Sequence, residues 1–212
     1  MEKESKGFTL IELMVVVTIV GILAAIAIPN FLKYQLRSRF CEASSNLAAL
    51  HKAEEALRQS ERPITINGIP VSAANYAPGQ YWNLGGGLIP AAGVVGTQRL
   101  PWSSGDIDIV NAIDWQMEGP TYFQYGVATP CAGIPAAAQA GICYGAGAIA
   151  DIDGDGILGN LALAKPSLAG AVPAAFGAGV AFPGPPGCGC FPTGGSSTIY
   201  GVPCASSLPD VF

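Results

Sequence analysis

The feature that most constrains this chain is an apolar run near its N-terminus. From Phe8 to Leu32 the sequence has 25 residues and a single charge, that of Glu12. As a helix with a rise of about 1.5 Å per residue, this run is roughly 37 Å long, enough to cross a hydrocarbon core of about 30 Å with some tilt. A cleaved secretory signal fits less well, because its apolar region normally has about 7–15 residues. The run therefore predicts a transmembrane helix.

Three residues in this run do not suit a plain membrane anchor. Glu12 would place an ionisable side chain in hydrocarbon, which is costly unless the carboxylate finds a partner. Pro29 has no N–H to donate to the carbonyl of Ala25, so it weakens the helix locally. Gly21, two turns earlier, is about 1 kcal/mol worse than Ala in a helix. These residues suggest that the helix also has a role outside the membrane.

The stretch KGFTLIELMVVVTIVGILAAIAIPNF, from Lys6 to Phe31, resembles the N-terminal segment of type IV pilins and of the related pseudopilins. The shared features are a short charged leader, then Gly7, Phe8 and Glu12, and then an apolar helix. The resemblance becomes weaker towards Ser60. Further along the chain, TYFQYGVATP and ADIDGDG are similar only in general layout to strand segments of longer type IVa pilins.

The resemblance implies how the N-terminal segment is processed and assembled. A membrane-embedded prepilin peptidase would cut between Gly7 and Phe8 and methylate the new amine of Phe8. In a helical filament of identical subunits, this amine would meet Glu12 of a neighbour, because neither charge is tolerated alone in apolar surroundings. Such a pair sets register more than it adds stability. We expect the helix to loosen between Gly21 and Pro29 in a filament, but to be nearly unbroken in an isolated subunit.

Beyond the apolar run the pattern becomes that of an amphipathic helix. Apolar residues recur at spacings of three and four, as they do on one helix face; they are Phe40, Ala43, Leu47, Leu50, Ala53 and Leu57. Pro63 should end the helix. We therefore expect one helix from Phe8 to about Ser60, whose second half packs against a globular head.

The predicted fold class is α+β, with this long helix packed on a small antiparallel β-sheet head that has long loops rich in Gly and Pro. The predicted parts are a leader at 1–7, a transmembrane or filament-core helix at 8–32, an amphipathic helix half at 33–62 and a β-rich head at 63–212. Strands are expected at Thr121–Ala128, Gly141–Asp153 and Ser197–Val202. Segments 64–120 and 165–196 show no clear periodicity.

Charge and motif content narrow the function. Up to Arg62 the chain has 8 Lys/Arg and 7 Asp/Glu, whereas the rest has 2 and 8. The acidic second part is a poor partner for nucleic acid, whose affinity comes mainly from Lys and Arg. The only histidine, His51, is expected to be a solvated helix residue. The GGG at 85–87 lacks the helix and lysine of a phosphate loop, and we predict no enzyme.

The cysteines predict disulfides rather than a zinc site, because no histidine cluster accompanies them. There are six: Cys41, Cys131, Cys143, Cys188, Cys190 and Cys204. Cys131 and Cys143 bracket the connection between two expected strands. A bridge that closes a loop of this size is worth roughly 3 kcal/mol in the entropic model. This is the first pair that we expect.

The remaining cysteines leave alternatives open. Cys188 and Cys190 are too close in sequence to pair with each other without strain, so one of them is expected to bridge to Cys204. We take Cys190 for this bridge, with Cys188 as the alternative. Cys41 then either forms a third bridge or is a free buried thiol.

The motif DIDGDG, which begins at Asp151, is the one candidate ligand site. Asp151, Asp153 and Asp155 occupy the first, third and fifth places of a calcium loop, and the carbonyl of Ile157 is available at the seventh. The twelfth place is Ala162, so the bidentate Glu of such loops is missing. A tight turn after a strand is the alternative, since Asp and Gly are the residues expected there. Calcium is the only cofactor that the sequence suggests.

The function implied by the resemblance is that of a structural subunit of a type IV pilus, used for surface attachment and twitching motility. Its partners would be identical subunits, the prepilin peptidase and an inner-membrane assembly platform. It would lie in the inner membrane before assembly and in an extracellular pilus afterwards. The alternatives are a minor pilin, a pseudopilin of a type II secretion system and, from another class, a membrane-anchored binding protein that never polymerises.

Overall fold

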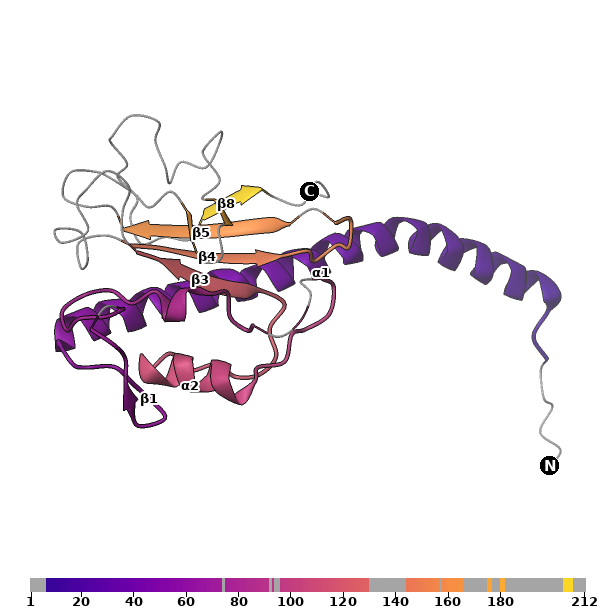
Figure 1. The fold of residues 1–212 in the computed structure, drawn as a ribbon. Helices are drawn as coiled ribbons and strands as arrows, with labels where there is room; N and C mark the ends of the chain where they lie inside the picture. The colour runs from indigo at the N-terminus through magenta and orange to yellow at the C-terminus, as the bar shows by residue number, and fades with distance from the viewer. Residues whose placement is uncertain are drawn as a thin grey trace, which may run out of the picture. The chain divides into compact units, whose positions relative to one another are not determined.

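A computed structural model describes the chain from residue 7 onward, except for residues 74, 92, 94–95, 130–143, 157, 166–174, 177–179, 182–203 and 208–212. The described elements are α1 (Leu10–Ser60), β1 (Thr65–Ile66), β2 (Ile69–Pro70), the 3-10 helix η1 (Leu84–Gly86), α2 (Ser104–Ala112), β3 (Gln124–Ala128), β4 (Tyr144–Ala150), β5 (Gly159–Lys165), β6 (Ala175–Phe176), β7 (Val180–Ala181) and β8 (Cys204–Ser207) (Figure 1). The chain forms two compact units, Met1–Ser38 and Arg39–Phe212.

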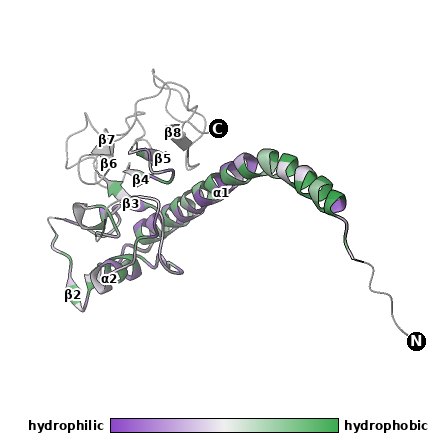
Figure 2. Ribbon diagram, turned by 90° about the vertical axis from the view of Figure 1, so that its right-hand side faces the viewer, coloured by the Kyte–Doolittle hydropathy of each residue, from purple (hydrophilic) through white to green (hydrophobic). Residues whose placement is uncertain are grey.

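The first unit contains the N-terminal part of α1. Its large apolar side chains from Phe8 to Leu32 are all exposed, from 51% at Leu32 to 80% at Phe8. Figure 2 shows much of this part of the helix in the green of hydrophobic residues, with a hydrophilic patch at its N-terminal end. Within the described residues, α1 is the one helix that is long and apolar enough to cross a membrane. The helix continues through Pro29 without a break, which confirms the expectation for an isolated subunit.

The second unit contains the remainder of α1, and here one face of the helix is buried. The buried residues are Ala43, Leu47, Leu50, Glu54 and Leu57. Four of these belong to the predicted apolar stripe, and its other two members, Phe40 and Ala53, are half-buried. Glu54 was not expected on this face. The helix ends at Ser60, three residues before Pro63, as predicted.

The head is built on a four-stranded antiparallel sheet with the order β3-β4-β5-β8. In Figure 1 the sheet runs along the C-terminal half of α1. Every residue of β4 is buried. Side chains join the sheet to the helix: Asn46 donates a hydrogen bond to the hydroxyl of Tyr125 at 2.8 Å, and the rings of Phe40 and Phe123 meet edge to face at 5.9 Å. The predicted α+β fold class is confirmed.

The strand predictions were partly right. The strand expected at Thr121–Ala128 begins only at Gln124, and Thr121 pairs with Leu100 in an isolated bridge. The strand expected at Gly141–Asp153 is β4, which ends before Asp151. The strand expected at Ser197–Val202 lies outside the described residues.

The two longest elements of the head that were not predicted are α2 and β5. The segment 64–120 contains α2, which begins with a capping box: Asp106 N–H donates to Ser103 Oγ at 3.2 Å, and Ser103 N–H donates to Asp106 Oδ2 at 3.0 Å. The second missed element is β5, which pairs with β4 along its whole length. Its short alternation of Leu and Ala carries little signal, because Ala is not a strand former.

Candidate assembly site

Glu12 lies in the first turn of α1 and is held there by Thr9. The backbone N–H of Thr9 donates to Glu12 Oε2 at 2.9 Å, and the Thr9 hydroxyl donates to the same oxygen at 2.5 Å. In return, the Glu12 N–H donates to Thr9 Oγ1 at 3.3 Å. This reciprocal arrangement is a capping box, which satisfies backbone donors that the first turn leaves free. It was not among the predicted features, although T-x-x-E is its usual signature.

The carboxylate of Glu12 also borders an apolar surface. Phe8, Ile11, Val15 and Val16 line a shallow groove together with Glu12. Phe8 itself is 80% exposed. One exposed acid thus sits at the edge of an apolar face, close in sequence to the residue expected to carry the new amine.

Gly21 and Pro29 lie within the continuous helix. A side chain at Gly21 would meet nothing within 4 Å in the described part of the chain. The missing N–H of Pro29 does not interrupt α1 in the single chain, which agrees with the view that one proline weakens a helix locally. The loosening between the two residues in a filament stays a prediction.

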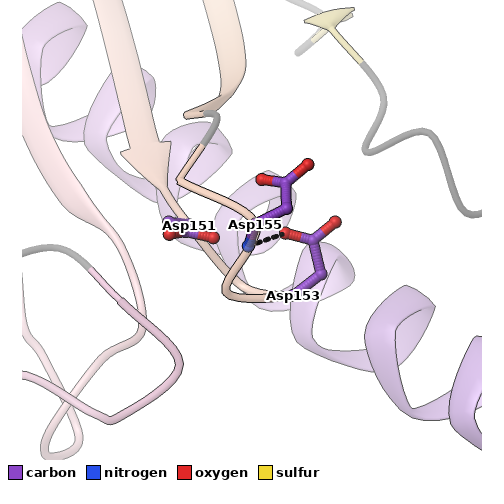
Figure 3. A group of neighbouring side chains, drawn as sticks. All are labelled: Asp151, Asp153 and Asp155. Atoms are coloured by element: carbon purple, nitrogen blue, oxygen red, sulfur yellow. Dashed lines mark hydrogen bonds between the residues drawn. The ribbon is translucent and has the colours of Figure 1, made fainter.

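The three aspartates of DIDGDG come together after β4 (Figure 3). One carboxylate oxygen from each of Asp151, Asp153 and Asp155 lies within 4.8 Å of the others. The loop also forms hydrogen bonds of its own: the N–H groups of Gly154 and Gly156 donate to the two oxygens of Asp151 at 2.7 and 3.1 Å. Both glycines have positive φ, of 82° and 85°, a conformation that glycine adopts at no steric cost.

These observations account for the motif as a turn. Asp151 acts as the acceptor of an Asx-type turn, and the glycines supply the backbone angles that the turn needs. Calcium takes six to eight oxygens, whereas the described part of the loop offers three carboxylates. The twelfth place, Ala162, is a buried residue of β5, and Ile157 lies outside the described residues. The acidic cluster alone therefore does not identify a metal site.

Cys41 is free and exposed on α1. The alternative that made it a buried thiol was wrong about burial, because Cys41 lies two positions before the buried stripe starts at Ala43. Cys131, Cys143, Cys188 and Cys190 lie outside the described residues. Cys204 opens β8, but its side chain is not described. The two disulfide pairings therefore stay predictions.

His51 is not the solvated residue that we expected. Its ring is half-buried, stacks on Tyr144 at 5.8 Å between centroids, and hydrogen bonds through Nδ1 to the Tyr144 hydroxyl. Burial lowers the pKa of His51. No local pattern signals this contact, because Tyr144 comes from β4, far along the chain. His51 joins the helix to the sheet.

Comparisons with known proteins agree with this geometry. Residues 3–28 match the family model described as the prokaryotic N-terminal methylation motif. The chain is 35% identical over 147 residues to the type IV major pilin protein PilA of Myxococcus xanthus (strain DK1622), which covers 69% of this chain and 54% of that protein. No solved structure matches the chain significantly.

Two further relatives match over a shorter part of the chain. A fimbrial protein of Pseudomonas aeruginosa is 47% identical over 68 residues, 32% of this chain and 44% of that protein. The type IV major fimbrial protein FimA of Dichelobacter nodosus is 51% identical over 55 residues, 26% of this chain and 35% of that protein. The matches thus span about half or less of the length of these relatives.

The fold and the site define a class of protein: an N-terminal helix long and apolar enough to anchor in a membrane, continued by an amphipathic half that carries a β-sheet head. The N-terminal motif and the relatives then identify the family. The chain belongs to the type IV pilin family.

Proposed function

We propose that the chain is the major structural subunit of a type IV pilus filament. The observation that carries this proposal is the exposed apolar surface of the first half of α1, with Glu12 at its edge. Such a surface needs lipid or other copies of the same helix to cover it. A filament supplies those copies, and the membrane supplies the lipid beforehand.

Processing would create the Phe8 amine, which is the second group needed for assembly besides Glu12. A prepilin peptidase would cut between Gly7 and Phe8 and methylate the Phe8 amine. The family model that matches residues 3–28 is named for this methylation. A side chain added at Gly7 would meet none of the described residues within 4 Å, which favours access of a protease to the backbone there. The mature chain would then start with a cation at Phe8, four positions before Glu12.

The capping box holds the Glu12 carboxylate in the single chain, before it pairs with the amine of another subunit. In the single chain, Glu12 accepts hydrogen bonds from Thr9, so its carboxylate is partly satisfied before assembly. In a filament, the amine of an incoming Phe8 would approach Glu12 of a neighbour, where charge-assisted hydrogen bonds are the stronger ones. A subunit in the wrong register would leave both charges buried and unpaired, which is strongly disfavoured.

The remaining assignments follow from this role. The chain would be anchored in the inner membrane, be extracted by an assembly platform and end in an extracellular pilus. Its chemistry is that of a substrate for processing and not of an enzyme. The relatives reported above are named as pilins or fimbrial proteins, which favours a pilus over a type II secretion pseudopilin.

Electron microscopy of cells that lack the gene tests the proposal. We expect no pili on the deletion strain and normal pili when the wild-type gene is restored. Shorter or fewer pili would contradict the major role and support a minor pilin. Normal pili together with a defect in protein secretion would contradict the pilus and favour the pseudopilin.

A further inference from the structure

Glu54 is a fully buried acid at the place where α1 packs against the head. Its side chain is 0% exposed. Oε2 accepts one hydrogen bond, from the backbone N–H of Trp82 at 3.0 Å. Oε1 is also buried and has no hydrogen-bond partner among the described residues. An ionised carboxylate in this place would lack most of the acceptor interactions that it has in water.

Three ionisable groups interact with Glu54 electrostatically: Glu55 beside it on α1, Tyr76 of the following loop and Tyr144 of β4. His51 and Arg58 lie one turn away from Glu54 on α1, and Tyr81 and Lys165 of β5 belong to the same cluster through Glu55. The two cations are already engaged: Lys165 forms an ion pair with Glu55 Oε1, and Arg58 Nε lies 3.6 Å from Glu55 Oε2. In the described part of the chain, no cation pairs with Glu54.

The surroundings therefore oppose a negative charge at this position. Burial is the main cause that raises the pKa of Glu54, to about 8, and the charge of Glu55 adds to it; the Trp82 N–H acts in the opposite direction. The pKa values of Tyr76 and Tyr144 are raised by burial and also by the charge of Glu54. Groups on both the helix and the sheet therefore disfavour a second negative charge in this cluster.

We propose that Glu54 is an uncharged carboxylic acid in the folded head and that its ionisation weakens the packing of the head on α1. A neutral acid needs fewer hydrogen bonds than a carboxylate. An ionised Glu54 needs water, which can reach it only if the segment that carries Trp82 moves away from the helix. Glu54 is then a pH-sensitive lock between α1 and the head.

The direction of the pH effect follows from proton linkage. The ordinary pKa of a glutamate is 4.5, against about 8 for Glu54 in the fold. Between these values the folded chain holds a proton that the unfolded chain has lost, so stability falls as pH rises, by up to about tenfold in the folding equilibrium per pH unit. The loss slows as pH passes through the folded pKa and then stops, because both states are ionised there.

His51 has the opposite effect at lower pH. Burial lowers its pKa below 6.5, so the unfolded chain takes up a proton there before the folded chain does, and acid destabilises the fold. The two effects overlap below pH 6.5. From pH 6.5 to 8 the effect of Glu54 is largely separated from that of His51, and this is the window to measure.

Denaturant unfolding of the full chain in detergent micelles tests the lock. From pH 6.5 to 8 we expect the folding equilibrium constant of the wild type to fall by roughly fifteenfold. Glu54→Gln removes the titration and should flatten the curve. Glu61→Gln, an exposed change just after the same helix, should retain the wild-type slope. Parallel curves for wild type and Glu54→Gln would overturn the proposal.

A direct titration covers the case in which Glu54→Gln does not fold. Carbon-13 NMR of the wild-type chain, labelled at the glutamate carboxyl carbons, reports the protonation of each glutamate. We expect one resonance with a midpoint near pH 8 in the folded chain and near 4.5 in denaturant. If every glutamate of the folded chain titrates near 4.5, Glu54 is ionised at neutral pH and the lock does not exist.

Discussion

The two halves of α1 have opposite surroundings, although they form one continuous helix. The N-terminal half carries large apolar side chains that are exposed along its whole length. The C-terminal half buries a single face, with Leu47 and Leu50 at 0% exposure, against the head of the same chain. One half thus has its packing partner within the chain, and the other must find it outside.

This difference indicates that the two halves of the helix have different roles. Burial of apolar surface is worth about 25 cal/mol per Å², and the first half can gain it only from lipid or from other subunits. The second half gains it when the chain folds. Changes in the first half should therefore alter assembly without altering the stability of the head, and changes in the second half should do the reverse.

The largest expected effect is that of Glu12→Val. The substitution removes the carboxylate that would meet the Phe8 amine, and an unpaired buried charge costs about 3–5 kcal/mol. Subunit addition should fall by about a hundredfold or more, whereas membrane insertion and head stability should not change. Counting pili by electron microscopy, with immunoblots of the membrane fraction, measures both.

Glu12→Gln is the matched control for this change. It retains an acceptor for the hydrogen bonds of Thr9 but removes the charge, so it separates the capping box from the ion pair. We expect Glu12→Gln to assemble as poorly as Glu12→Val. Normal pili with the Gln variant would show that the cap matters and the charge does not.

A pair of leucine substitutions sharpens the comparison between the halves. Leu47→Ala truncates a side chain that is 0% exposed. It should lower the free energy of unfolding of the head by about 2–5 kcal/mol. Leu13→Ala changes a side chain that is 56% exposed, and should change that free energy by about 0.5 kcal/mol or less. Denaturant unfolding in detergent measures both; equal losses would remove the distinction between the halves.

Smaller effects are expected for the ion pairs of the head. Lys165 pairs with Glu55 at a partly buried site, so Lys165→Met should cost about 1–2 kcal/mol. Arg62 and Asp114 form a more exposed pair, and Arg62→Met should cost about 0.5 kcal/mol or less. Unfolding at low and high salt checks this order, and the reverse order would contradict it.

The sequence was informative where a pattern repeats along the chain. The spacing of Leu47, Leu50 and Leu57 predicted the buried face of α1, and the structure confirms it. Local signals were also present but missed: Thr9 with Glu12 and Ser103 with Asp106 follow the spacing of capping boxes. Asn-Gly at 67–68, the turn between β1 and β2, is a usual hairpin signal.

Other features could not be read from the sequence. The residue type of Glu54 opposes its helical position, because glutamate is almost never fully buried, although Glu54 follows Leu47 by seven positions and therefore shares its face of α1. The partner of His51 comes from β4, which is distant in sequence. The strand β5 depends on its pairing with β4, because its Ala-rich sequence has little strand preference of its own.

The central claim is that the first half of α1, with a free Phe8 amine and Glu12, is an assembly device. Intact-mass spectrometry of pili sheared from cells tests it most directly. The account predicts that the pili consist of this chain, beginning at Phe8 and heavier by one methyl group. Pili that contain the chain with Met1 as its first residue, or pili without this chain, would contradict it.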